Sequence, residues 1–132
     1  MYLLDTNTCI QYISRRNPAI IHRLQARSPQ DIFLCDVVKY ELYYGAYWSA
    51  YPGQNLNVLR DFFSEFISLP FDGRAAQICG QLRAQLAALG TPIRPYDLQI
   101  AAIALANNLA VVTHNVKEFN RVNGLAIEDW EL

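Results

Sequence analysis

The chain has 132 residues, with 11 basic and 12 acidic side chains and a formal charge of −1. Hydrophobic residues make up 52% of it and charged residues 17%, which excludes an intrinsically disordered chain. The length predicts one domain over residues 1–132, and the near-neutral charge does not indicate a nucleic-acid partner but leaves room for a local basic patch.

No apolar run reaches the roughly 18–20 residues of a membrane span, so we expect no membrane contact. The first residues meet Asp5 without a basic region, which is not the pattern of a signal peptide. Cys9, Cys35 and Cys79 are widely separated and fit neither a disulfide framework nor a zinc knuckle. These features predict a cytoplasmic protein.

Short apolar runs alternate with amphipathic segments along the chain. Strands are predicted at 2–4, 32–35, 67–71, 110–113 and 125–127. Helices are predicted after Asp5, from Pro18, over 37–50 with Asp36 as the cap, over 57–66, after Asp72, over 97–108, and as one turn at 116–120. The alternation predicts an α/β sandwich around a mostly parallel sheet.

Three carboxylates occupy places where this pattern calls for apolar side chains. Asp5 ends the first strand, and ligands bind beyond the carboxyl ends of strands in open α/β sheets. Glu41 lies on the apolar stripe of the helix over 37–50, and Asp97 begins a helix with an apolar inner face. Taken singly, Asp5 and Asp97 could be helix caps and Glu41 a boundary residue.

Taken together, three inward acids at the starts of separate elements can converge on one pocket. Lys39 and Arg94 are the nearest basic residues in sequence, and neither spacing forces an ion pair. Buried carboxylates need neutralisation, a partner or a metal, and Mg²⁺ prefers oxygen ligands while keeping waters for a substrate phosphate. The three acids therefore predict a metal site able to activate water against a phosphodiester.

Four strings, in register over nearly the whole chain, carry a family resemblance. They are Leu3-Leu4-Asp5-Thr6-Asn7, Tyr40-Glu41-Leu42-Tyr43-Tyr44-Gly45-Ala46, Pro95-Tyr96-Asp97-Leu98-Gln99-Ile100-Ala101-Ala102, and Val112-Thr113-His114-Asn115-Val116-Lys117-Glu118-Phe119 with the Glu128-Asp129-Trp130 segment. Together they resemble PIN-domain ribonucleases, and among these the VapC toxins of toxin–antitoxin pairs.

This resemblance implies a three-layer α/β/α sandwich and an endoribonuclease that cleaves cellular RNA, including tRNA as a candidate, and inhibits translation. It implies Mg²⁺ as the cofactor, with Mn²⁺ as a substitute, a VapB-type antitoxin as the partner, and a homodimer. By position, Asp5 and Asp97 correspond to the principal metal ligands and Glu41 to a third acid that shares the ion or orients its water. Thr113 matches a hydroxyl near the metal waters.

The chain departs from the family pattern at two positions. Asn115 stands where many PIN domains have a fourth acid, and the missing charge favours one bound metal ion over two. Glu118 could compensate for the missing charge, or it could be a solvated side chain. Tyr96 replaces a smaller polar residue and could stack on an RNA base or only cover the loop. We also predict that Arg94 contacts the substrate, and His114 is a further candidate as a general acid.

Two other functions are compatible with parts of this pattern. A non-catalytic PIN-like module that binds RNA or protein would fit Asn115, whereas the three acids favour the enzyme. A phosphoacceptor receiver domain would need an acid pair near the start and a mid-chain acceptor aspartate, which the chain lacks. An aromatic cluster between Tyr40 and Tyr51 exceeds what one core stripe needs, so a dimer or antitoxin surface is expected there.

Overall fold

A five-stranded sheet organises the structure, a computed structural model that describes residues 1–132. Its strands are β1 (Tyr2–Leu4), β2 (Ile32–Cys35), β3 (Ile67–Leu69), β4 (Ala110–Val112) and β5 (Ile127–Glu128). They lie in the order β3-β2-β1-β4-β5, and every adjacent pair is parallel. The predicted α/β fold with a mostly parallel sheet is therefore confirmed.

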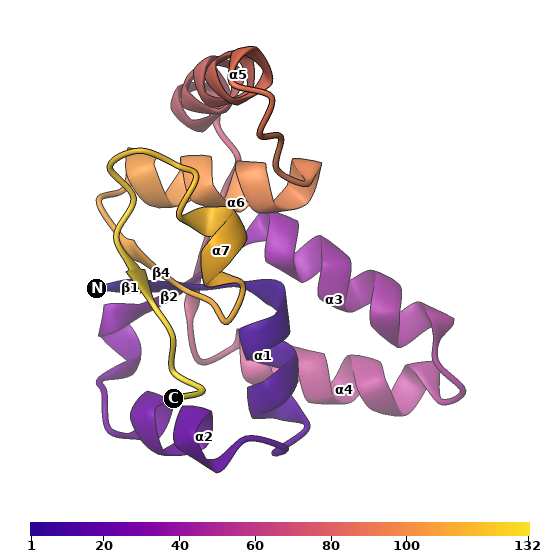
Figure 1. Ribbon diagram of the computed structural model, residues 1–132. Helices are drawn as coiled ribbons and strands as arrows, with labels where there is room; N and C mark the ends of the chain where they lie inside the picture. The colour runs from indigo at the N-terminus through magenta and orange to yellow at the C-terminus, as the bar shows by residue number, and fades with distance from the viewer.

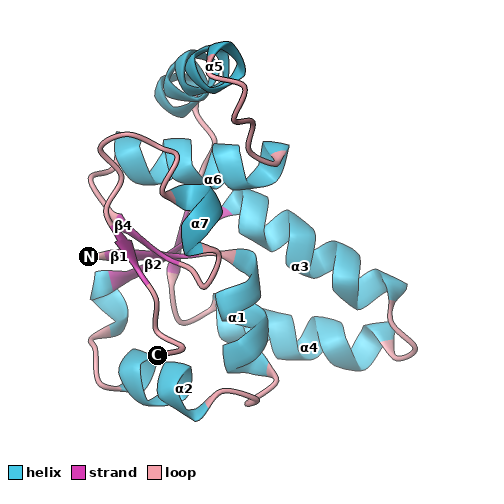
Figure 2. Cartoon of the chain, viewed as in Figure 1, coloured by secondary structure: helices cyan, strands magenta, loops and turns pink.

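Helices cover both faces of this sheet (Figure 1). They are α1 (Thr6–Ile13), α2 (Pro18–Gln25), α3 (Asp36–Trp48), α4 (Pro52–Phe63), α5 (Gly73–Ala88), α6 (Pro95–Ala106) and α7 (Val116–Phe119), and a 3₁₀ turn, η1 (Pro29–Asp31), precedes β2. In Figure 1, α5 and α6 lie above the sheet and α1 and α2 below it, while α3 and α4 form a hairpin that extends to the right. Figure 2 shows the resulting three layers, with the strands in the middle.

Strand β1 lies at the centre of the sheet. Leu3 pairs with Phe33 of β2 on one side and with Val111 of β4 on the other. Leu3 and Leu4 are fully buried, as expected for a parallel strand covered on both faces. The chain runs from β1 to β2 and β3 on one side and then crosses to β4 on the other, and such a divergence opens a crevice at the carboxyl ends of the strands.

Helix α6 is buried on nearly all sides. Residues 100–104 of α6 are fully buried in the hydrophobic core, because α5 packs on the side of α6 that faces away from the sheet (Figure 1). A helix that is apolar all round requires such complete cover. This packing fixes the position of its first turn, which carries Asp97. No helix in the chain combines the length and apolarity needed to cross a bilayer.

The region around α3 and α4 differs from the prediction. Helix α3 spans Asp36–Trp48 instead of 37–50, and its cap position is Cys35 instead of Asp36. The Asp36 carboxylate accepts a 2.6 Å hydrogen bond from Ser68 and so connects the ends of β2 and β3. Pro52 begins α4 and does not merely end α3, which is the role proline takes at a first helical position.

Other boundaries also differ, among them those of α6 and of the last strand. Helix α6 begins at Pro95 with Arg94 at its cap position, so the interpretation of Asp97 as an N-cap is wrong; Asp97 is the third helical residue. The last strand is Ile127–Glu128 and not 125–127, because Val111 and Val112 of β4 pair with these two residues. The strand at 32–35 and the Asp72 cap are confirmed, and the turn predicted at 116–120 is present as α7, Val116–Phe119.

Candidate active site

A cavity of about 690 Å³ opens at the carboxyl ends of β1 and β4. All three acids predicted from the sequence line it, Asp5 after β1, Glu41 from α3 and Asp97 from α6. Tyr96 and Asn115 complete its polar wall. The fold therefore brings together side chains that lie far apart in the chain.

Asp5 is the most buried of these acids, with 5% of its surface exposed. It is also the N-cap of α1, since its Oδ1 accepts a 2.8 Å hydrogen bond from the backbone N–H of Thr8. Burial raises the pKa of Asp5, and hydrogen bonds from Thr113 and Thr8 oppose the rise. Asp5 therefore caps α1, as one interpretation of the sequence proposed, and it also lines the cavity.

Glu41 is held in place by the first residue of α1. The Thr6 hydroxyl donates a 2.7 Å hydrogen bond to Oε1 of Glu41. The Glu41 side chain is half-buried and lines the cavity, so it is not a boundary residue that turns away into solvent. The Thr6 bond fixes one carboxylate oxygen of Glu41 and leaves Oε2 for other partners.

Asp97 pairs with Arg94, the one arginine in the cavity lining. The Arg94 guanidinium donates from Nε at 3.2 Å and from Nη2 at 3.0 Å, both to Oδ2 of Asp97. Burial raises the pKa of Asp97 to about 6; Arg94 acts to lower it, whereas Glu118 and Asp5 act to raise it. The spacing of Arg94 and Asp97 in the sequence does not require this ion pair, but an i, i+3 spacing on a first helical turn permits it.

Glu118 is a tethering residue and not a solvated side chain, so the solvated alternative is wrong. Its Oε1 accepts a 2.7 Å bond from the backbone N–H of Arg94, and its Oε2 accepts a 2.6 Å bond from the Asn115 amide. Burial acts to raise the pKa of Glu118, but these bonds and the Arg94 charge together hold it below its ordinary value. Glu118 thus joins α7 to the loop before α6 and orients Asn115.

Thr113 follows the last residue of β4 and precedes His114 and Asn115, which line the cavity. It is fully buried, and its Oγ1 accepts a 2.9 Å hydrogen bond from the backbone N–H of Asn115. Its side chain also hydrogen-bonds Asp5 and thereby opposes the rise in the Asp5 pKa. Thr113 therefore contacts Asp5 directly, whereas Asn115 is joined to Thr113 and Glu118 to Arg94, the partner of Asp97.

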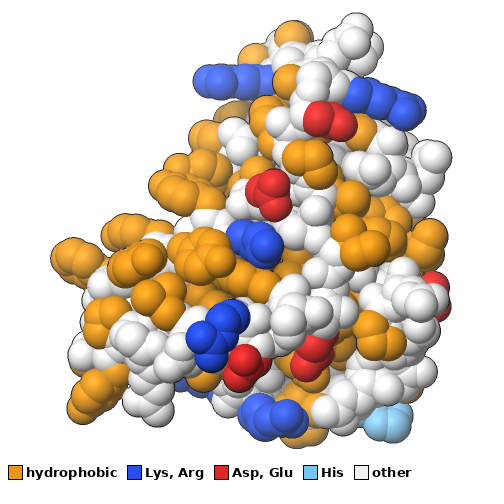
Figure 3. All heavy atoms as spheres, turned by 180° about the vertical axis from the view of Figure 1, so that it is seen from behind, with side chains coloured by type: hydrophobic (Ala, Val, Ile, Leu, Met, Phe, Trp, Pro, Cys, Tyr) orange, Lys and Arg blue, Asp and Glu red, His pale blue; other side chains and the backbone are white.

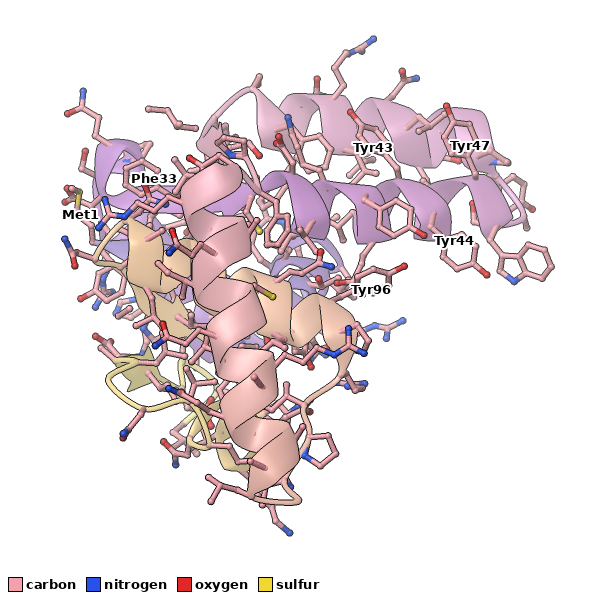
Figure 4. All side chains as sticks on the ribbon, turned by 90° about the horizontal axis from the view of Figure 1, so that it is seen from above. Met1, Phe33, Tyr43, Tyr44, Tyr47 and Tyr96 are labelled. Atoms are coloured by element: carbon pink, nitrogen blue, oxygen red, sulfur yellow. The ribbon has the colours of Figure 1, made fainter.

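Tyr96 stands at the edge of the cavity beside α3. Its ring meets that of Tyr40 edge to face with centroids 5.4 Å apart, and its hydroxyl donates a 3.3 Å bond to the Tyr40 hydroxyl. In Figure 4, Tyr96 lies on the side of α6 that faces α3. The Tyr40 contact stabilises the ring, while 43% of Tyr96 remains exposed.

His114 lines the cavity but turns its ring toward the C-terminal segment. Its Nδ1 lies 3.0 Å from Oδ2 of Asp129 and 3.3 Å from Oε2 of Glu131. The hydrogen bond to Asp129 raises the pKa of His114 above its ordinary value. Sequence analysis did not predict these carboxylate partners, because only the fold places residues 129–131 beside β4.

The cavity fits a divalent cation on the chemistry of its donors. Three carboxylates line it beside one arginine, Arg94, and two of the three, Asp5 and Asp97, have raised pKa values caused by burial. Hard divalent cations relieve such a cluster, because they bind oxygen ligands. Asp5, Glu41 and Asp97 are the residues that would hold the ion.

Exposed aromatic side chains gather on the α3–α4 hairpin, outside the cavity. The set consists of Tyr40, Tyr43, Tyr44, Tyr47, Trp48 and Tyr51. Tyr43, Tyr44 and Tyr47 project from α3 in Figure 4, and Figure 3 shows hydrophobic side chains gathered over this hairpin at its left. The prediction that part of this cluster is exposed is confirmed.

Comparisons with known proteins show the family to which the chain belongs. A family profile described as the PIN domain matches residues 2–125. A Salmonella typhimurium protein named tRNA(fMet)-specific endonuclease VapC is 42% identical over 98% of this chain and 97% of its own. The Shigella flexneri protein of the same name is 40% identical with the same coverage.

Solved structures of VapBC proteins have the same fold as this chain. The chain superposes on DNA-bound VapBC from Salmonella typhimurium with a TM-score of 0.92 at 42% identity, covering 98% of this chain and 97% of that one. It superposes on VapBC2 from Rickettsia felis, bound to a DNA fragment from their promoter, with a TM-score of 0.91 at 33% identity, covering 98% of each chain. The chain therefore belongs to the PIN-domain family and, within it, to the VapC ribonucleases.

Proposed function

We propose that this chain is the toxin of a toxin–antitoxin pair, a single-domain endoribonuclease over residues 1–132 that depends on Mg²⁺, with Mn²⁺ as a substitute. The observation that carries the proposal is the convergence of Asp5, Glu41 and Asp97 on one cavity. The names of the relatives favour this enzyme over a non-catalytic RNA- or protein-binding module.

In this proposal, Asp5 and Asp97 are the main metal ligands and Glu41 is the third. The bound ion would supply charge neutralisation at the scissile phosphate and lower the pKa of water. Glu41, with Oε1 fixed by Thr6, offers Oε2 to accept the proton of the attacking water. Thr113, Asn115 and Glu118 support the acids, and Asn115 contributes an oxygen but no charge.

Arg94 and Tyr96 are proposed to bind the RNA at the rim of the same cavity. Arg94 is 74% exposed at its side chain and offers a planar donor group suited to phosphate. Tyr96 presents a ring that is held against Tyr40 and suited to stacking on a base. The substrate class is tRNA, and the initiator tRNA named in two relatives is the first candidate.

The partners follow from the same comparisons. The neighbouring structures are complexes of VapC with VapB, so we propose a VapB-type antitoxin for this chain. A homodimer is proposed through its exposed aromatic residues on α3. The proposed place of action is the cytoplasm, where the RNA substrate is made.

The test is cleavage of total tRNA by the purified chain, with cleaved species mapped by sequencing. We expect cleavage with Mg²⁺, none after chelation, and none with Asp5→Asn. A wild-type protein that leaves RNA intact with both Mg²⁺ and Mn²⁺, yet binds RNA, would instead support the non-catalytic module.

A further inference from the structure

One guanidinium, that of Arg94, lies in the cavity lining. It lies between two carboxylates, 3.0 Å from Oδ2 of Asp97 and 3.5 Å from Oε2 of Glu118. Both acids are largely shielded from solvent, with 15% and 14% of their side chains exposed, whereas 74% of the Arg94 side chain is exposed. Arg94 therefore covers the acids from the open side of the cavity.

The two partners of Arg94 hold it in different ways. Glu118 also binds the Arg94 backbone N–H at 2.7 Å, which anchors the main chain of the loop independently of the guanidinium. Asp97 receives two donors from the guanidinium on one oxygen, Oδ2. The side chain can therefore leave Asp97 while the loop stays fixed through Glu118.

The ion pair has a direct consequence for metal binding. On the proposed function, Asp97 is a metal ligand, and a divalent ion requires its carboxylate oxygens. The guanidinium uses Oδ2 of that carboxylate and adds a like charge close to the incoming ion. A metal ion and Arg94 therefore compete for the same carboxylate.

We propose that Arg94 is the counter-cation of the metal-free site, which a divalent ion must displace from Asp97. The proposal rests on the proposed function, because it takes Asp97 as a ligand. In the metal-free protein Arg94 neutralises the acids and weakens metal binding. Once displaced, its guanidinium lies at the rim of the cavity, still anchored by its main chain, where a phosphate of RNA can meet it.

The test is a set of Mn²⁺ titrations followed by electron paramagnetic resonance at pH 8, where Asp97 is ionised. Arg94→Gln should bind Mn²⁺ about three- to tenfold more tightly than the wild type, because both the competing ion pair and the charge repulsion are lost. Arg83→Gln removes the same charge from the exposed face of α5 and should leave Mn²⁺ affinity unchanged.

Thermal melting provides the second readout. Without metal, Arg94→Gln should melt below the wild type, because Asp97 and Glu118 lose their shared cation, and saturating Mn²⁺ should remove the difference. Arg94→Lys keeps the charge without the planar donor group, so its Mn²⁺ affinity should fall between those of the wild type and Arg94→Gln.

The outcomes separate this inference from the proposed function. If Arg94→Gln binds Mn²⁺ with unchanged or weaker affinity while Asp97→Asn abolishes binding, Arg94 only tethers the loop and the inference fails alone. If neither the wild type nor Arg94→Gln binds Mn²⁺, the proposed metal site fails and the inference with it.

Discussion

The Thr6 hydroxyl donates a 2.7 Å hydrogen bond to Oε1 of Glu41, across 35 residues of sequence. This bond connects the first residue of α1 to the middle of α3, and it occupies one of the two carboxylate oxygens of Glu41. It makes Thr6 a positioning residue, because its effect on the proposed reaction acts through Glu41.

Thr6→Val tests this positioning role. Valine keeps the shape of threonine and removes the hydroxyl, so we expect kcat for RNA cleavage to fall by about fivefold for the loss of roughly 1 kcal/mol of orienting interaction. KM should change little. Thr91→Val, at an exposed threonine of the loop before α6, is the control, and equal kcat values for all three proteins would contradict the role.

Glu41→Gln should abolish cleavage while the fold survives. The amide oxygen can still accept the Thr6 hydrogen bond, but the side chain can no longer take a proton or contribute a charge. We expect an unchanged or slightly higher melting temperature without metal, because one of several clustered acids is removed. An active Glu41→Gln protein would show that Glu41 does not take part in the reaction.

Substitution by asparagine should separate the metal-binding role of Asp5 and Asp97 from their structural roles. Asp5→Asn keeps the oxygen that caps α1 through Thr8, so the protein should fold, and calorimetric titration should show loss of Mg²⁺ binding. Asp97→Asn should give the same loss. Unchanged Mg²⁺ affinity in both variants would rule out the site.

Metal affinity should depend on pH through Asp97. Burial raises its pKa to about 6, so protons compete with the metal as the pH falls through 6, and affinity should drop there. The raised pKa also means that the folded, metal-free protein favours the protonated form of Asp97. Protonation of Asp97 therefore contributes fully to the stability of the folded protein below the ordinary pKa of 3.8, and this contribution is lost as the pH rises through about 6. Calorimetric titrations at pH 5, 6 and 8 test the first point; equal affinities at pH 5 and pH 8 would contradict it.

Asn115→Asp should destabilise the metal-free protein. Its amide donates a 2.6 Å hydrogen bond to Oε2 of Glu118, and aspartate would replace this donor with a like charge. We expect a lower melting temperature without metal and a larger stabilisation by Mn²⁺ than in the wild type, because the added acid favours a second ion. Asn123→Asp, at an exposed position, controls for the charge; identical melting curves for it and Asn115→Asp would show that residue 115 lies outside the site.

The sequence predicted the parts of the fold that local patterns determine. The apolar run at 32–35 and the Asp72 cap are such features, and both are confirmed. The error at Asp36 has a tertiary cause, because Ser68 on the neighbouring strand takes the carboxylate that was expected to cap α3. The last strand was misplaced because its bounds depend on pairing with β4 and not on its own residues.

The same division applies to the site. The three acids were predicted because charged residues in apolar positions are visible in a sequence. The partners of those acids were not, because Thr6 and Glu41 are joined across the fold, as are His114 and Asp129. Glu118 was ambiguous for this reason: its surroundings consist of Arg94 and Asn115, which only the packing of α7 against the loop before α6 brings together.

The most direct test of the proposed metal site is anomalous diffraction from crystals of the purified chain soaked in Mn²⁺. We expect a peak within coordination distance, roughly 2.0–2.6 Å, of carboxylate oxygens of Asp5 and Asp97, with Glu41 beside it and Arg94 moved away from Asp97. A peak held instead by His114, Asp129 and Glu131, whose candidate ligand atoms lie within 4.8 Å of one another, with none between Asp5 and Asp97, would contradict it.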